Sequence, residues 1–275
     1  MADILINGEE KNTINVSDRG LQYGDGLFET MAVQNGKINL WQDHWQRLKS
    51  GCERLLISLP DKKTVEKEIT LLCEKNRESK FVIKLIVTRG EGQRGYRFSK
   101  EQNVTRILSV HQWPGYPKKN TIEGVAVRYC DTVLSENPGL AGIKHLNRLE
   151  QVLARNEWRD NKYQEGLMLN LHGDVIDGTM SNIFVVKGRK IITPDLSLSG
   201  VAGVMRKNII KLAEKIKLSV CIEKLDKNKL ENADELFLTN SLFGIWPVKS
   251  LGDSTFPKIG EITKALQKEV SKLGC

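Results

Sequence analysis

One lysine, Lys144, lies where the sequence changes from a turn to a helix, and a lysine amine in such a position can serve as a nucleophile or a base. Small residues are frequent in 139–142, and apolar residues then recur at Leu146, Leu149 and Leu153. This i, i+3, i+7 spacing predicts an amphipathic helix directly after the lysine. Most lysines are simply exposed to solvent, so the spacing leaves both interpretations of Lys144 open.

Two arginines are candidates for binding anions. Arg47 lies in a helix predicted over 42–56, and its guanidinium is permanently charged and has several donors. His44, one turn earlier, is more typical of a capping or packing histidine than of a catalyst. Arg94 and Tyr96 lie in a glycine-rich loop, where they can present a guanidinium and a hydroxyl to one carboxylate. Taken alone, the loop favours plain solvent exposure of Arg94.

The glycines of that loop also match a nucleotide-binding pattern. Gly90, Gly92 and Gly95 follow a predicted strand with the G-x-G-x-x-G spacing of dinucleotide-binding proteins. The polar residues 97–102 do not resemble the helix whose N-terminus would hold a pyrophosphate. We therefore interpret the segment as a flexible loop.

A second glycine-rich segment, 199–203, opens a predicted helix. The first backbone amides of that helix can bind a phosphate without a charged side chain. Many loops enter helices through glycine, so this motif is only moderately specific.

The segment 17–26 has the composition of a turn. Its glycines allow positive φ, and its aspartates can accept hydrogen bonds from nearby backbone amides. For Asp18, Arg19 and Asp25 we therefore prefer a purely structural interpretation.

The elements that must position these residues succeed one another without regular alternation, which favours α+β domains with mixed sheets over a doubly wound fold. The dipeptide Asn35-Gly36 between two strands predicts a type I′ hairpin turn. We expect an N-terminal α+β domain over 1–112, a linker over 113–122 and a C-terminal α+β domain over 123–275. Strands are predicted at 3–7, 28–33, 38–40, 81–87, 104–110, 125–130, 166–170, 182–186, 190–193, 219–223, 235–238 and 246–249. Helices are predicted at 42–56, 64–75, after Lys144, and at 204–217 and 261–273.

Composition excludes several classes of protein. The chain has 275 residues, 40% of them hydrophobic and 28% charged, and it contains no apolar run of the ~18 residues that would span a membrane. The net charge is +8, but the basic residues are interspersed with acidic ones, so we expect no nucleic-acid partner. The excess positive charge can still attract an anionic substrate. Five scattered cysteines suggest neither disulfides nor a metal site. No secretory signal is recognisable, and a cytoplasmic protein is expected.

Taken in order, several segments resemble the fold-type IV pyridoxal-phosphate enzymes, the family of branched-chain and D-amino-acid aminotransferases. The clearest is Gly-Ile-Lys-His-Leu-Asn-Arg-Leu-Glu-Gln at 142–151, which is similar to the segment that carries the cofactor lysine. The resemblance implies a two-domain α+β fold, a pyridoxal 5'-phosphate cofactor, a small-molecule substrate and a homodimer. The other matching segments are 17–30, 43–48, 89–96, 174–184, 199–206 and 238–241.

The resemblance also implies roles for particular residues. Lys144 would bind the cofactor covalently and act as a catalytic base, with Thr30 beside it and Phe28 lining the pocket. Asp177 would pair with the pyridine nitrogen, a position where the family generally has glutamate, which is one methylene longer. The phosphate would be bound by Arg47, by the amides of Val204 and Met205, and by Asn240 and Ser241, while Arg94 and Tyr96 would contact the substrate.

Two activities are compatible with these implied roles. One is a lyase that acts on an amine-bearing ring with two carboxylates. The other is a branched-chain or D-amino-acid aminotransferase, which would use the same Lys144, Arg47 and Asp177. The sequence around Lys144, together with Arg94 and Tyr96, favours the lyase.

Overall fold

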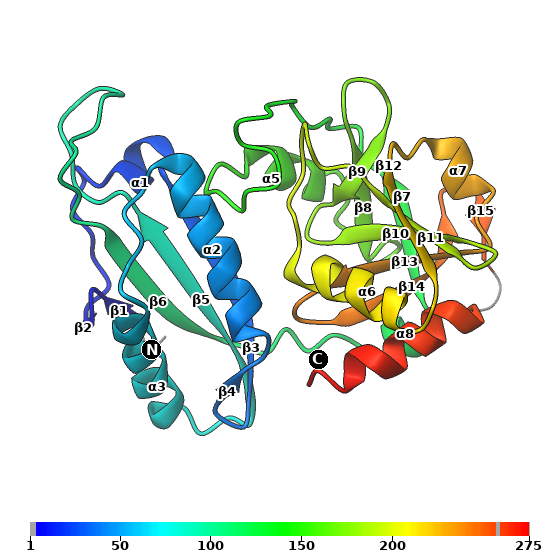
Figure 1. The fold of residues 1–275 in the computed structure, drawn as a ribbon, viewed down its shortest axis with the longest axis horizontal. Helices are drawn as coiled ribbons and strands as arrows, with labels where there is room; N and C mark the ends of the chain where they lie inside the picture. The colour runs from blue at the N-terminus through cyan, green and yellow to red at the C-terminus, as the bar shows by residue number, and fades with distance from the viewer. Residues whose placement is uncertain (1–3, 257–258, 275) are drawn as a thin grey trace. The chain divides into compact units, whose positions relative to one another are not determined.

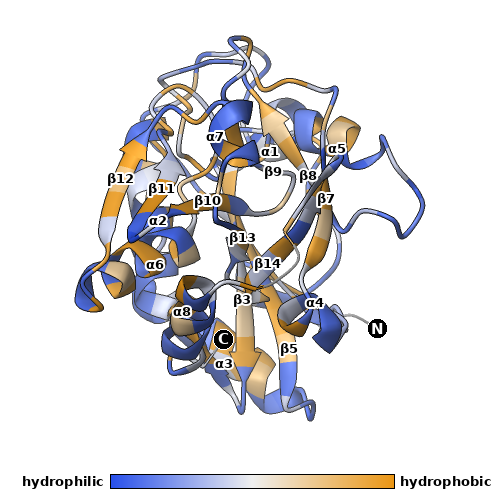
Figure 2. Ribbon diagram, turned by 90° about the vertical axis from the view of Figure 1, so that its right-hand side faces the viewer, coloured by the Kyte–Doolittle hydropathy of each residue, from blue (hydrophilic) through white to orange (hydrophobic). Residues whose placement is uncertain are grey.

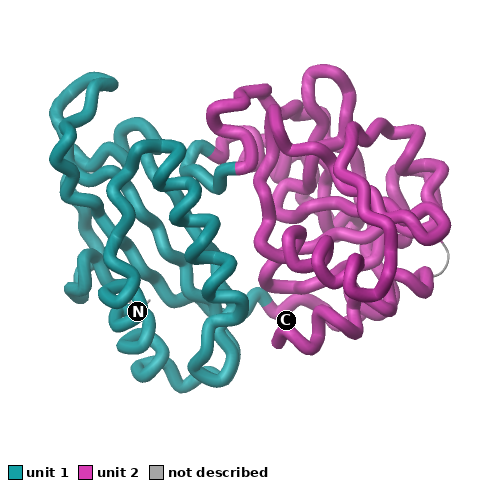
Figure 3. The backbone as a smooth tube through the Cα atoms, in the orientation of Figure 1, with its two compact units in different colours: residues 1–114, 143–147 teal, residues 115–142, 148–275 magenta. Residues whose placement is uncertain are grey.

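A computed structural model of the chain describes residues 4–256 and 259–274. The chain divides into two compact units (Figure 3). Unit 1 comprises residues 1–114 and 143–147, and unit 2 comprises residues 115–142 and 148–275. The short segment 143–147, which lies inside the range predicted for the C-terminal domain, therefore belongs to unit 1.

Unit 1 is a six-stranded sheet in which every neighbouring pair of strands is antiparallel, in the order β2-β1-β6-β5-β3-β4 (Figure 1). Its helices α2 and α3 contribute Trp45, Leu48, Val65 and Leu72 to one core with the inward side chains of the strands. The strands are β1 (Ile4–Ile6), β2 (Glu9–Glu10), β3 (Gly26–Gln34), β4 (Lys37–Ile38), β5 (Lys80–Thr88) and β6 (Thr105–Gln112), and the helices are α1 (Arg19–Tyr23), α2 (Trp41–Leu55) and α3 (Lys62–Lys75).

The predicted hairpin between β3 and β4 is confirmed. Val33 pairs with Ile38, and Gln34 pairs with Lys37 across a two-residue turn. Asn35 and Gly36 have φ values of 49° and 73°. Positive φ at both central residues is what a type I′ turn requires.

Unit 2 is built on a nine-stranded mixed sheet with the order β12-β11-β10-β13-β14-β7-β8-β9, to which β15 adds beside β14. Among the described strands, β11 is parallel to β12, β14 to β7 and β7 to β8. The strands are β7 (Val125–Tyr129), β8 (Glu165–Leu169), β9 (Val175–Gly178), β10 (Asn182–Lys187), β11 (Lys190–Pro194), β12 (Ser219–Glu223), β13 (Glu235–Asn240), β14 (Gly244–Leu251) and β15 (Ser254–Thr255). The helices are α4 (Lys118–Ile122), α5 (Leu149–Arg155), α6 (Val204–Lys215), α7 (Lys227–Glu231) and α8 (Glu261–Ser271).

The predicted α+β class is confirmed. The prediction of mixed sheets holds for unit 2 but is wrong for unit 1, whose neighbouring strands are antiparallel. Hydrophobic residues gather along strands such as β3, β5 and β10, whereas the helices carry many polar positions (Figure 2). This distribution is what burial of the sheets in the cores of the two units demands. The short elements α1, α4, α7, β2, β9 and β15 were not predicted, because segments of two to five residues carry little periodicity.

The helix predicted directly after Lys144 is wrong in two respects. Helix α5 begins only at Leu149, because the backbone of His145 and Leu146 pairs with β3 instead. Leu149 and Leu153, which the spacing assigned to a buried stripe, are 76% and 62% exposed. Backbone pairing with a strand therefore overrides the helical periodicity of this segment.

Candidate active site

Lys144 is held by its backbone against β3 in unit 1. Phe28 N donates to Lys144 O at 3.1 Å, and Leu27 forms an antiparallel bridge with His145. The half-buried Lys144 side chain places Nζ 4.2 Å from the centroid of the Phe28 ring. The turn predicted before the lysine is present, since the amides of residues 140 and 141 both donate to Asn137 O. The amine is thus aimed at a defined aromatic face.

The face of β3 that meets this amine carries Phe28 and Thr30. Both are partly exposed, while Glu29, between them, is buried on the opposite face, as the alternation of a strand requires. Lys84 pairs with Thr30 in the next strand, and its Nζ lies 5.3 Å from the Phe28 ring centroid. The side-chain nitrogens of Lys144 and Lys84 therefore face the same ring. Lys84 was not identified from the sequence.

Arg47 is bound by a buried carboxylate. Its Nε donates to Glu29 Oε1 at 2.8 Å and its Nη2 to Glu29 Oε2 at 2.5 Å, while His44 Nδ1 lies 2.6 Å from Oε2. Burial raises the pKa of Glu29, but the charge and hydrogen bonds of Arg47 and His44 outweigh it and hold the pKa at about 2. His44 is fully buried, in keeping with the packing role expected for it. Glu29, which the sequence did not single out, fixes the orientation of Arg47.

Asp177 lies on β9 in unit 2 and is 4% exposed. Its Oδ2 accepts a hydrogen bond from Val201 N at 3.0 Å. Burial lowers the pKa of Arg148 and of Arg206, and the charge of Asp177 acts against that lowering in both. The carboxylate of Asp177 thus interacts electrostatically with two arginines of unit 2.

The turn after Asp177 is organised by Glu165, a fully buried carboxylate on β8. Glu165 accepts hydrogen bonds from Thr179 Oγ1 at 2.5 Å, from Ser181 Oγ at 2.7 Å and from the amides of Thr179 and Met180 at 3.1 and 3.2 Å. Burial raises the pKa of Glu165, and these hydrogen bonds oppose the rise. Glu165 therefore fixes the turn between β10 and β9, the strand that carries Asp177.

Helix α6 begins where the phosphate-binding amides were predicted. Its N-cap is Gly203, which makes no side-chain capping bond, and the side chains of Val204 and Met205 are buried. Only their backbone amides can serve an anion. A Cβ at Gly203 would lie 2.0 Å from Asn182 Oδ1, so this entry to the helix requires glycine.

The side chain of Asn240 forms hydrogen bonds around the turn that follows β13. Its Oδ1 accepts from Leu242 N at 2.9 Å and from Phe243 N at 3.0 Å, and its Nδ2 donates to Met180 O at 3.2 Å. The side chain thus closes the turn between β13 and β14, in which Ser241 also lies. Phosphate binding by this turn stays a prediction.

Arg94 and Tyr96 are both exposed, in a loop without regular structure. No helix succeeds the glycines within 91–104, which agrees with the interpretation as a loop rather than a dinucleotide site. Beside the loop lies a cavity of about 690 Å³, whose lining includes Arg19, Arg89, Arg94 and Arg97 as well as Glu91 and Glu101. The lining of this cavity therefore carries more arginines than acidic residues.

Within residues 4–256 and 259–274, no group of three or more histidines, cysteines or acidic residues is arranged to hold a metal. No helix in the same part of the chain has the length and hydrophobicity needed to cross a bilayer. Cys52, Cys73, Cys130 and Cys221 are free thiols. Cys275 lies outside the described residues.

Comparison with known proteins identifies the family. The model of amino-transferase class IV matches residues 26–251. The chain belongs to this family. It is 36% identical to an aminodeoxychorismate lyase of Vibrio harveyi over 95% of this chain and 97% of that protein. The crystal structure of 4-amino-4-deoxychorismate lyase from Pseudomonas aeruginosa is similar with a TM-score of 0.93 and 45% identity, over 98% of both chains. A putative branched-chain-amino-acid aminotransferase of Methanocaldococcus jannaschii is 33% identical over 97% of this chain and 94% of its own length.

Enzymes of this family depend on pyridoxal phosphate, and the residues of each unit fit that group. Unit 1 supplies a half-buried lysine amine facing an aromatic ring and an arginine held by a buried carboxylate. Unit 2 supplies a buried aspartate flanked by two arginine charges and a helix start whose N-cap is glycine. An aldehyde requires an amine, a phosphate requires cationic or N–H donors, and a protonated ring nitrogen requires a carboxylate acceptor. The two units carry groups of these kinds.

The first prediction concerns Glu29. Because its folded pKa of about 2 lies below the ordinary 4.5, its ionised form contributes stability that is complete above pH 4.5 and is lost as pH falls towards 2. Glu29→Gln should remove this acid-dependent part of the unfolding free energy. At neutral pH it should also cost about 3 to 5 kcal/mol, because Arg47 loses its buried partner. Chemical denaturation from neutral to acidic pH measures both effects.

Glu53→Gln is the matched control, since Glu53 is an exposed glutamate of the same helix as Arg47. This variant should keep the parent's pH dependence. A Glu29→Gln variant that loses stability with acid as steeply as the parent would show that Glu29 is not the group responsible.

Proposed function

We propose that the protein is a pyridoxal-phosphate-dependent lyase that converts 4-amino-4-deoxychorismate to 4-aminobenzoate and pyruvate, a step of folate biosynthesis. The observation that carries this proposal is the 45% identity and TM-score of 0.93 to a 4-amino-4-deoxychorismate lyase across 98% of both chains. The residues with chemistry in both units fit the cofactor, as described above. The direct test is to incubate the purified holoenzyme with the substrate and to measure 4-aminobenzoate and pyruvate in equal amounts.

The reaction needs a base at the carbon that bears the amine. When bound, pyridoxal phosphate supplies a ring that accepts the electrons released at that carbon. The Lys144 amine takes the proton from the carbon and later returns a proton to the departing enolpyruvyl group. The ring–oxygen bond breaks, the departing group becomes pyruvate, and the remaining ring becomes aromatic. Thr30, on the same strand face as Phe28, is placed to orient the substrate beside Lys144.

The remaining residues hold the cofactor and the substrate. Asp177 keeps the ring nitrogen protonated from a buried position on β9. Arg47 and the amides of Val204 and Met205 bind the phosphate, with Asn240 and Ser241 in support. Positive charge at Lys84, Arg94 and the cavity beside the 91–97 loop suits a substrate with two carboxylates.

An aminotransferase is the second candidate, and a specific observation keeps it open. The chain is also 33% identical to a putative branched-chain-amino-acid aminotransferase over nearly its whole length, and such an enzyme would use the same Lys144, Arg47 and Asp177. The two activities differ in the step after proton removal. Transfer of the amine to a keto acid, without formation of 4-aminobenzoate from aminodeoxychorismate, would favour the aminotransferase.

We also propose a cytoplasmic homodimer. Leu149, Val152 and Leu153 form an exposed apolar stripe on α5, with 54% to 76% of their surface accessible, and a second copy of the chain would cover such a patch. The free thiols described above agree with a reducing compartment. Sedimentation equilibrium measures the mass in solution directly.

The second prediction concerns Lys144. Lys144→Ala should lose nearly all turnover and should lack the absorbance band of lysine-bound cofactor, because the amine that binds and deprotonates is gone. Borohydride should fix the cofactor to the parent at Lys144, as peptide mass mapping would show. Lys84→Ala is the control, since Lys84 faces the same ring but should leave the covalent bond intact. Borohydride labelling at a lysine other than Lys144 would contradict the assignment.

The third prediction concerns the short acid. Asp177→Asn should reduce turnover much more than cofactor affinity, because it removes the charge that keeps the ring nitrogen protonated while its size is unchanged. Asp177→Glu, which restores the usual residue of the family, should keep more activity than Asp177→Asn. Normal turnover by Asp177→Asn would mean that the ring nitrogen has another partner.

The fourth prediction separates substrate binding from cofactor binding. Arg94→Ala should lower kcat/KM by about ten- to a hundredfold, as expected for loss of a charged hydrogen bond, with cofactor absorbance unchanged. Arg47→Ala should instead weaken cofactor retention first. Arg97→Ala removes the same charge from a nearby position of the same loop and should have a much smaller effect. Equal effects of Arg94→Ala and Arg97→Ala would indicate a general charge effect in place of a specific contact.

A further inference from the structure

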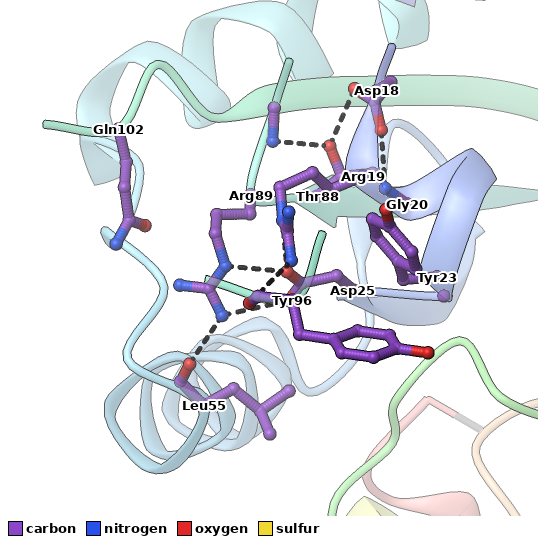
Figure 4. Close-up of polar contacts among 12 residues, drawn as sticks. Asp18, Arg19, Gly20, Tyr23, Asp25, Leu55, Thr88, Arg89, Tyr96 and Gln102 are labelled. Atoms are coloured by element: carbon purple, nitrogen blue, oxygen red, sulfur yellow. Dashed lines mark hydrogen bonds and ion pairs between the residues drawn. The ribbon is translucent and has the colours of Figure 1, made fainter. Parts of the chain in front are cut away.

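The loop that carries Arg94 and Tyr96 has no regular structure, yet its backbone is bound by one buried arginine. Arg19 Nη1 donates to Gly95 O at 2.8 Å, and Arg19 Nη2 donates to Tyr96 O at 3.2 Å. Arg19 is 4% exposed. Its guanidinium therefore uses two donors on the two residues directly after Arg94. Figure 4 shows Arg19 with Asp25 and Tyr96.

Tyr23, on helix α1 with Arg19, binds the same residue, Gly95, at its backbone N–H. Its hydroxyl accepts from Gly95 N at 3.0 Å, and its ring meets the Tyr96 ring edge-on at 5.7 Å. Arg19 in turn lies over the Tyr23 ring, with Cζ 4.7 Å from the centroid. Both the amide and the carbonyl of Gly95 are thus occupied by side chains of α1.

The loop also packs closely on the stem of Arg19. A Cβ added at Gly92 would lie 2.8 Å from Arg19 Cδ. Gly95 has a φ of 105°, a conformation that favours glycine. Gly92 therefore lets the backbone pass close to the arginine, and Gly95 permits the positive φ.

Arg19 is itself held by the Asp25 carboxylate, which also binds Arg89. Arg19 Nε donates to Asp25 Oδ2 at 3.0 Å, and Arg89 binds both oxygens of the same carboxylate at 2.7 and 2.9 Å. Arg89 also donates to Leu55 O and Leu56 O at the end of α2. Burial raises the pKa of Asp25, but hydrogen bonds from Arg89 and Arg19 outweigh it, so the pKa is lowered and the carboxylate stays ionised.

We propose that Arg19 and Tyr23 are positioning residues that hold the 93–97 segment in one conformation, so that Arg94 and Tyr96 meet a carboxylate of an anionic substrate at a set spacing. This role rests on the substrate contact proposed above for Arg94 and Tyr96. The physical reason is that an irregular exposed loop otherwise loses conformational entropy on binding. Prior fixation of its backbone removes that cost and lowers KM without changing the chemical step.

Two variants test the role in the holoenzyme. Tyr23→Phe removes only the acceptor for Gly95 N, and Arg19→Lys keeps the charge but cannot bind Asp25 and two carbonyls together. Amide hydrogen exchange in 91–97 should become about two- to tenfold faster in Tyr23→Phe and about tenfold or more in Arg19→Lys, in proportion to the strengths of neutral and charged hydrogen bonds. KM for 4-amino-4-deoxychorismate should rise by similar factors, while kcat and cofactor absorbance stay near the parent's.

Lys100→Ala, at an exposed position beyond the same segment, is the control and should change neither exchange nor KM. Exchange in β5 reports whether the sheet is intact, and Tyr23→Phe carries the test if Arg19→Lys does not fold. Unchanged exchange in 91–97, or faster exchange with an unchanged KM while Arg94→Ala raises KM, overturns the positioning role. An Arg94→Ala variant with the parent's KM overturns the substrate contact itself, which is a separate failure because the exchange result does not depend on it.

Discussion

The backbone pairing of the lysine segment with β3 is the constraint that sets the position of Lys144 in unit 1. Phe28 N donates to Lys144 O, and Leu146 N donates to Gly26 O. These bonds place the amine of Lys144 beside the face of β3 that carries Phe28 and Thr30, while Glu29 is buried on the other face. Because successive side chains of a strand point to opposite sides, one short strand segment organises both the surroundings of the lysine and the carboxylate that holds Arg47.

Buried and partly buried carboxylates have the same function at several places in this protein. Glu29 orients Arg47, Asp25 orients Arg19 and Arg89, and Glu165 orients the turn after Asp177. Burying a charge is costly, and the attraction of its partners roughly offsets that cost without a large gain in stability. The gain is geometric, since each carboxylate fixes a side chain or a turn in one orientation.

The residues proposed to bind the cofactor do not distinguish a lyase from an aminotransferase, because both need a lysine base, a phosphate site and an acid at the ring nitrogen. The distinction must arise where the substrate is recognised. In unit 1 the candidates are Lys84, beside Phe28, and the loop with Arg94 and Tyr96. Arg19 and Tyr23 lie in the 17–26 segment and are proposed to hold the backbone of this loop. Through that contact, the 17–26 segment would affect which substrate the loop binds.

The sequence by itself determined the α+β class, the longer helices and strands, the type I′ turn at Asn35-Gly36 and the resemblance that identified the family. These features are local, because periodicity, turn chemistry and short motifs depend on neighbouring residues. The tertiary structure decided that residues 145–146 pair with β3 in place of forming a helix, and that Glu29, Glu165 and Arg19 are buried and bound. Arg19 and Tyr96, for example, are 77 positions apart, and a single sequence carries no local signal for a partner at that distance.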